Sequence, residues 1–147
     1  MTVDRQRLIG AWELERWETR YDDGRVIHPM GEDARGYLYY TADGHMAAFL
    51  MRANRPAFVT GEALTASDAE KVAAWNSFYA YAGRFELEGE SVIHHVYASL
   101  YPNWVGQDQP RTIRFEGPNL LLTTSPQNTR RGIQRSTIWW RRPNGRA

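Results

Sequence analysis

Alternating apolar and polar positions run through most of the chain and predict short β-strands, since a strand with one buried face shows this period. Glycine-containing turns, such as Asp22-Asp23-Gly24 and Ala42-Asp43-Gly44, separate neighbouring runs and are typical of antiparallel connections. The predicted strands are residues 8–21, 26–30, 36–41, 45–51, 83–88, 91–101, 111–116, 120–125 and 134–142. This many short strands favours an antiparallel sheet closed into a barrel, because closure leaves no unpaired edge.

One segment in the middle of the chain has helical rather than strand periodicity. Ser67 and Glu70 have the spacing of a capping box, which begins a helix. The residues expected on one face of this helix are Val72, Trp75, Tyr79 and Ala82. With the irregular loop over residues 51–58, the helix is a candidate lid over the barrel or an inert plug. Residues 126–132 are predicted to form a mobile loop and residues 143–147 a loose tail.

Composition and charge exclude several classes of protein. The 147 residues contain no linker or repeat and predict a single domain over residues 1–147. A net charge of +1 gives no general reason to expect nucleic acid or a membrane as partner, although arginines gather in the last third of the chain. The absence of cysteine excludes disulfides and thiolate chemistry. Neither a signal peptide nor a membrane span is recognisable, so we expect a cytoplasmic protein.

Six short runs, spread in order over nearly the whole chain, carry a family resemblance. They are Leu8-Ile9-Gly10-Ala11-Trp12, residues 36–46, Arg55-Pro56, Tyr81-Ala82-Gly83, His94-His95-Val96 and Tyr101-Pro102-Asn103-Trp104-Val105-Gly106. With these runs the chain resembles the lipocalin-like domain family of bacteria and fungi. The resemblance implies an all-β fold, a closed antiparallel barrel of the calycin type with about 8–10 strands and an internal cavity.

The resemblance also implies how one end of the barrel is shut and what the barrel does. The ring of Trp12 fills the floor, and Arg141 or Arg142 at the end of the last strand covers it by stacking and hydrogen bonding. Some members accompany biosynthetic enzymes, where such barrels act as cyclases or isomerases. No set of catalytic residues is carried over by the resemblance.

Strand parity selects three polar residues as candidates for chemistry inside the barrel. Arg16 shares the face of Trp12 unless a bulge intervenes. It either binds a ligand oxygen or lies at the solvent-exposed end of its strand. His94 shares the more apolar face of its strand, whereas His95 faces the other way. In the cavity His94 either shuttles a proton or is a hydrogen-bonded core residue. Tyr39 either polarises a ligand carbonyl or fills the barrel.

Two functions follow, from different classes of protein. The first, which we favour at this point, is a cofactor-independent enzyme that isomerises or cyclises an apolar, oxygenated substrate as in natural-product biosynthesis, with His94, Arg16 and Tyr39 as its catalytic residues. The second is a non-catalytic carrier of a hydrophobic metabolite. Neither needs a cofactor or a metal, and a homodimer is possible. The predicted ligand-binding residues are Trp12, Leu14, Tyr37, Met46, Trp75, Val96 and Trp104.

Overall fold

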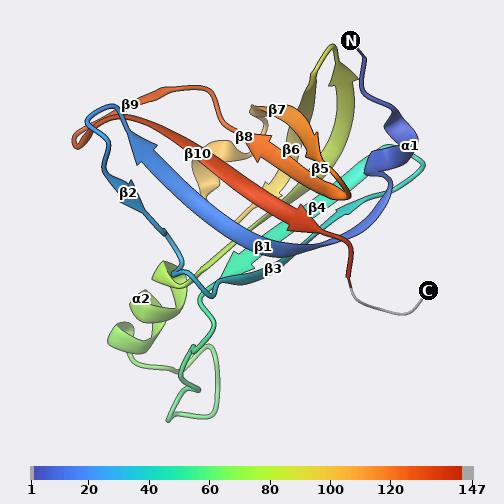
Figure 1. Ribbon diagram of the computed structural model, residues 1–147. Coiled ribbons are helices and arrows are strands. Elements are labelled where there is room, and N and C mark those ends of the chain that lie inside the picture. Colours follow the sequence, from blue (N-terminus) through green and yellow to red (C-terminus); the bar gives the residue numbers. More distant parts are fainter. Residues whose placement is uncertain (1, 144–147) are drawn as a thin grey trace.

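The strands of the computed structural model curl into a closed barrel (Figure 1). The structure describes residues 2–143, so most of the predicted C-terminal tail lies outside the described residues. The strands are β1 (Gly10–Tyr21), β2 (Val26–Ile27), β3 (Arg35–Tyr40), β4 (His45–Met51), β5 (Phe78–Glu88), β6 (Ser91–Ser99), β7 (Asp108–Glu116), β8 (Asn119–Thr123), β9 (Gln127–Thr129) and β10 (Gly132–Arg141). The helices are α1 (Arg5–Leu8), α2 (Asp68–Asn76) and the 3₁₀ helix η1 (Pro102–Trp104).

Eight strands form the barrel wall, and every pairing is antiparallel. The order is β1-β3-β4-β5-β6-β7-β8-β10, and β10 pairs back onto β1 to close it. β2 and β9 are short additions beside β1 and β10 at one end. The prediction of a closed antiparallel barrel with one helix between mid-chain strands is confirmed. The loop predicted over residues 126–132 contains the short strand β9 instead.

The predicted helix is too long at its C-terminal end. The Ser67–Glu70 capping box is present, but α2 ends at Asn76 and β5 begins at Phe78. Residues 78–83 pair with β4 over their whole length, and this tertiary pairing overrides the helical spacing. α2 buries none of its residues and projects away from the barrel (Figure 1). Among residues 2–143 no helix is both long and apolar enough to cross a lipid bilayer.

One end of the barrel is shut by Trp12, as the family resemblance implies. The Trp12 side chain is 2% exposed, and its indole N–H donates to the carbonyl of Leu8 at 2.9 Å. The Arg142 guanidinium lies 3.7 Å from the centre of the Trp12 ring. It also donates to the carbonyls of Ala11 (3.0 Å) and Arg7 (2.8 Å). The residue just after β10 therefore ties the barrel floor to α1 and the start of β1.

Gly83 is required by close contact between two strands. A Cβ atom at this position would lie 1.9 Å from the backbone oxygen of His95 on β6, at a shift in the β5–β6 register. A backbone oxygen cannot swing away as a side chain can, so the two strands would have to separate. We expect Gly83→Ala to lower the free energy of unfolding by about 2 kcal/mol, measured by urea denaturation. Unchanged stability would show that the β5–β6 pair is more pliable than its hydrogen bonding suggests.

Candidate ligand-binding cavity

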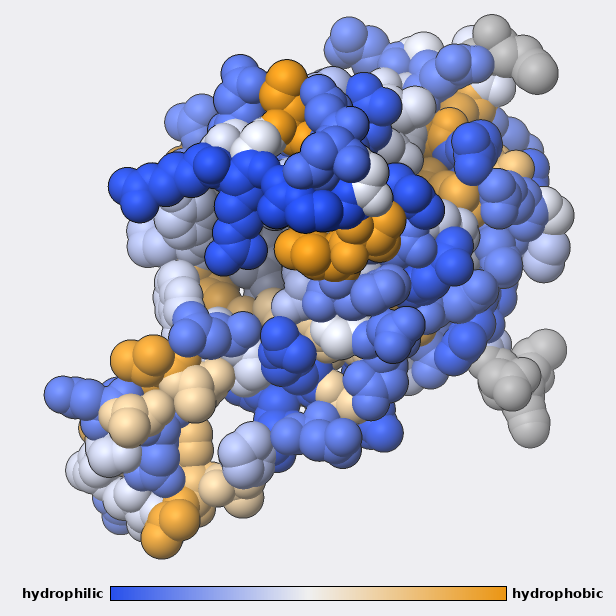
Figure 2. Space-filling view, turned by 60° about the vertical axis from the view of Figure 1, so that its left-hand side comes forward, coloured by the Kyte–Doolittle hydropathy of each residue, from blue (hydrophilic) through white to orange (hydrophobic). Residues whose placement is uncertain are grey.

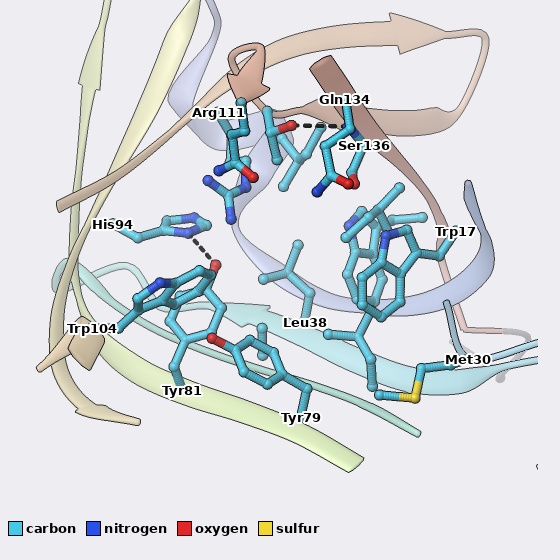
Figure 3. A pocket seen from close by; sticks show the side chains of 17 residues that line it. Trp17, Met30, Leu38, Tyr79, Tyr81, His94, Trp104, Arg111, Gln134 and Ser136 are labelled. Carbon is cyan, nitrogen blue, oxygen red and sulfur yellow. Dashed lines mark hydrogen bonds between the residues drawn. The ribbon is translucent and has the colours of Figure 1, made fainter. Parts of the chain in front are cut away.

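A cavity of about 260 Å³ lies inside the barrel, toward the end opposite the Trp12 floor. Figure 2 shows the surface hollowed on this side, next to the protruding α2 segment. Its walls combine aliphatic side chains, including Leu38 and Leu122, with several aromatic rings. Figure 3 shows His94, Arg111 and Trp104 on one side of the cavity and Trp17 with Gln134 on the other. A mostly apolar hollow with a few polar groups is the usual form of a small-molecule site.

His94 is held between two tyrosines. Its Nε2 lies 2.7 Å from the hydroxyl of Tyr40, and its Nδ1 lies 2.7 Å from the hydroxyl of Tyr81. His94 is only 1% exposed, and burial lowers its pKa to about 3, with the nearby charges of Arg111 and His95 adding to the effect. At neutral pH the imidazole is therefore uncharged, with one nitrogen donating and the other accepting.

The burial of Tyr40 decides which His94 nitrogen carries the proton. The Tyr40 hydroxyl lies in the core, and among the described residues its hydrogen-bond partner is His94. Its O–H must donate to Nε2, because a buried donor without an acceptor is destabilising by about 1–3 kcal/mol. Nδ1 then carries the proton and donates to Tyr81. Because Tyr81 lines the cavity, its own O–H is left to donate to a ligand.

Two buried indole groups on the opposite wall have no hydrogen-bond partner within the described residues. They are Nε1 of Trp17 and Nε1 of Trp140. Both rings line the cavity. The Tyr79 hydroxyl, a third buried lining group, has Ser99 as its neighbour without the geometry of a full hydrogen bond. Buried polar groups are normally satisfied, so these unpaired donors are a sign that a ligand or water completes the site.

His94 and Trp104 are the predicted site residues that the structure places at the cavity. His94 faces inward, as strand parity suggests, and His95 faces outward, where it pairs with Asp108 (2.7 Å) and Glu86 (3.0 Å). Trp104 lies on η1 with its ring edge-on to Tyr79 and Tyr81 at centroid distances of 5.2 and 5.3 Å. It closes one side of the cavity against those rings.

Arg16 lies outside the barrel, contrary to the expected inward orientation. Its guanidinium stacks 3.9 Å from the Trp139 ring and contacts the Glu18 carboxylate at 3.5 Å. The physical reason is a bulge in the β1–β10 pairing between Leu14 and Arg16, which shifts the alternation by one residue. Trp17 thereby takes the inward position beyond the bulge.

The other predicted residues also lie away from the cavity. Tyr37 and Tyr39 are on the outer face of β3, each 37% exposed and stacked on each other, and their neighbour Tyr40 points inward instead. Trp75 is 47% exposed on α2. The remaining four are buried core residues outside the cavity lining, namely Trp12, Leu14, Met46 and Val96.

Several residues that line the cavity are not among the site residues predicted from the sequence. The predicted helix extends to Ala82 and so includes Tyr79 and Tyr81, although residues 79–82 alternate bulky and small side chains as a strand does. In the sequence, Arg111 is one of the arginines that gather in the last third of the chain. Its strand alternates exposed with less exposed positions, and that period places Arg111 and Ile113 on the inner face. Trp17 follows the β1 bulge, for which the sequence carries no signal.

Comparison with known proteins identifies the family of this chain. The lipocalin-like domain family matches residues 9–143. The 4'-hydroxy-3'-methoxypropiophenone carrier protein ppsC of Aspergillus oryzae is 37% identical over 106 residues, which cover 66% of this chain and 96% of that protein. A lipocalin-like protein from Bacteroides uniformis is 14% identical, with a TM-score of 0.46 over 92% of this chain and 97% of that one. An uncharacterized protein from Bacteroides eggerthii is 12% identical, with a TM-score of 0.46 over 90% and 98%. The family match and the fungal relative show that this chain belongs to the lipocalin-like domain family.

Proposed function

We propose that the protein binds a small aromatic, oxygenated metabolite in the barrel cavity and carries it without converting it. The observation that carries this proposal is the set of unpaired donors around an otherwise apolar hollow. The indole N–H groups of Trp17 and Trp140 have no acceptor among the described residues. The O–H of Tyr81 is left to donate to a ligand when His94 Nδ1–H donates to the Tyr81 oxygen. A ligand with aromatic rings and acceptor oxygens would fill the hollow and satisfy them.

The size of the cavity limits the ligand. Its volume of about 260 Å³ is just below the roughly 300–1,000 Å³ typical of small-molecule sites. This favours a compact compound over a long lipid or a large polycycle. The fungal relative supports the same class, since its name assigns it a phenolic aryl ketone as cargo. We therefore take 4'-hydroxy-3'-methoxypropiophenone as the first ligand to test.

The electrostatics of His94 favour carriage over catalysis. A histidine with a pKa of about 3 is neutral at physiological pH and is a weak base. Burial also raises the pKa of Tyr40 and Tyr81, so neither hydroxyl readily gives up its proton. These groups are suited to holding a ligand oxygen. The isomerase or cyclase remains the second candidate, because His94 and Arg111 face the same cavity.

Filling the cavity should weaken binding. Ala48 lines the cavity from β4, whereas its neighbour Ala47 belongs to the opposite face of that strand. We expect Ala48→Leu to weaken binding of the ketone at least about tenfold, because the added side chain occupies ligand volume. Ala47→Leu is the matched control and should bind like the wild type. Quenching of tryptophan fluorescence measures both affinities, since Trp17, Trp104 and Trp140 line the site.

The same samples separate the two candidate functions. After incubation the ligand is extracted and analysed by chromatography and mass spectrometry. Recovery of unchanged ketone in amounts matching the protein supports the carrier. Steady formation of an isomer by the wild type but not by Ala48→Leu would overturn the carrier in favour of the enzyme. Equal affinities of the two alanine variants would place the ligand outside the cavity.

A further inference from the structure

The cavity has one charged side chain among the described residues that line it, and that side chain is cationic. Arg111 reaches the cavity from the first half of β7, while the lining contains no aspartate, glutamate or lysine. The neighbouring His94 is neutral at physiological pH. Arg111 is partly buried, and a partly buried cation is stabilised when its charge meets a partner.

The Arg111 guanidinium has more N–H donors than the hydrogen bonds it makes within the described residues. Its Nη1 donates to the backbone carbonyl of Pro110 at 2.9 Å, and the group lies 5.8 Å from the centre of the Trp104 ring. Within residues 2–143 no carboxylate comes within 4.0 Å of it. By contrast Arg114, on the same strand, pairs with Glu116 at 2.8 Å and is largely exposed. Most of the five N–H donors of Arg111 are therefore free for a ligand.

Arg111 also lies near the Tyr81 hydroxyl. Its charge acts on Tyr40, Tyr81 and His94 together: it offsets only part of the effect of burial, which raises the pKa of both tyrosines, and it adds to burial in lowering the pKa of His94. Figure 3 shows the guanidinium pointing into the cavity on the same side as His94. The Tyr81 O–H is free to donate because His94 Nδ1–H donates to its oxygen. The Arg111 guanidinium and the Tyr81 hydroxyl thus face one region of the cavity. Among the described lining residues there is no carboxylate that could accept their hydrogen bonds in place of a ligand.

We propose that the cavity binds its ligand as an anion, with an ionised phenol oxygen held between the Arg111 guanidinium and the Tyr81 hydroxyl. This deepens the proposed function and rests on it. An oxygen carrying negative charge accepts stronger hydrogen bonds than a neutral carbonyl and neutralises the lone guanidinium. In an acyl phenol the carbonyl delocalises the phenolate charge, so the ring ionises more readily than tyrosine does and can enter the cavity in that form.

The test follows the ionisation of the bound ligand directly. The phenolate of 4'-hydroxy-3'-methoxypropiophenone, the ketone chosen above as the first ligand to test, absorbs at longer wavelength than tyrosinate, so it can be titrated in the complex. We expect binding to lower the pKa of this phenol by about 1, which corresponds to about tenfold tighter binding of the anion than of the neutral form. The O-methylated ketone, which cannot ionise, should bind at least about tenfold more weakly than the phenolate.

Variants on one strand assign the effect to Arg111. Arg111→Met should abolish the lowering of the phenol pKa, whereas Arg111→Lys, which keeps the charge, should retain it in part. Arg114→Met removes the same charge from the outer face of β7 and should leave it unchanged. Circular dichroism establishes that each variant is folded before it is titrated.

The outcomes distinguish this inference from the proposed function. If the ketone binds with an unchanged phenol pKa, or if Arg111→Met binds the phenolate as the wild type does, the anionic mode is overturned and the carrier stands. If neither the phenol nor its O-methylated form binds to the folded protein, the proposed function itself fails for this class of ligand.

Discussion

Replacing Trp12 with alanine is expected to lower the free energy of unfolding by about 3–5 kcal/mol. The Trp12 ring is almost completely buried, so its removal leaves a large hole at the shut end of the barrel. The substitution also deprives the Leu8 carbonyl of its indole donor and the Arg142 guanidinium of the ring it covers. Urea denaturation followed by circular dichroism measures the loss.

The matched control is Trp75→Ala. Trp75 is about half exposed on α2, outside the barrel, so its truncation should change stability by less than about 1 kcal/mol. Trp12→Phe should recover part of the loss, because a phenylalanine ring refills most of the space but has no N–H donor for Leu8. A Trp12→Ala variant as stable as Trp75→Ala would contradict the role of Trp12 as the floor of the barrel.

The burial of neutral His94 should make the protein lose stability as the pH falls. The pKa of His94 is about 3 in the folded chain, against an ordinary value of 6.5. Between these two pH values the imidazole is protonated in the unfolded chain but not in the folded chain. Above pH 6.5 this difference is absent. Below it, the free energy of unfolding decreases by about 1.4 kcal/mol per pH unit, which amounts to about 3 kcal/mol by about pH 4.5.

Comparing two neighbouring histidines isolates this effect from the titration of carboxylates. His94→Gln should have a smaller fall in stability between about pH 6.5 and 4.5 than the wild type, since it cannot be protonated. Protonation of His95 has the opposite effect on the free energy of unfolding, because its outward pairing with Asp108 and Glu86 raises its pKa. The stability it contributes is present below pH 6.5 and lost as the pH rises through its folded pKa. His95→Gln should therefore still lose stability as the pH falls. Equal pH profiles for the wild type and His94→Gln would disprove that the burial of neutral His94 causes this loss.

The fold could be predicted because its signals are local. Period-two alternation and glycine turns recur along the chain, and each strand depends on only a few neighbouring residues. The same parity placed His94 inside the barrel and His95 outside. Parity failed at β1, where a bulge before Arg16 turned that residue outward. This bulge is set by the pairing of β1 with β10, which is far away in sequence. The residues near Arg16 therefore carry no signal that predicts it.

The polar part of the cavity could not be predicted for a related reason. The Tyr40–His94–Tyr81 group joins residues from β3, β6 and β5, and each taken alone resembles an ordinary core residue. Choosing among Tyr37, Tyr39 and Tyr40 required the register of β3 against β1, which is set by tertiary pairing. In the sequence nothing distinguishes Arg111 from the other arginines of the basic region, and it is the fold that brings Arg111 to the cavity.

The pairing of β1 with β10 has a consequence for how the protein is made. The ion pair between Glu13 and Arg141 joins residues 128 positions apart, and the barrel closes only when these two strands meet. During synthesis the barrel therefore stays open, with the residues of the future cavity exposed to water, until β10 has left the ribosome. Such distant closure predicts slow folding, on the order of milliseconds to seconds, in which closure follows the synthesis of β10.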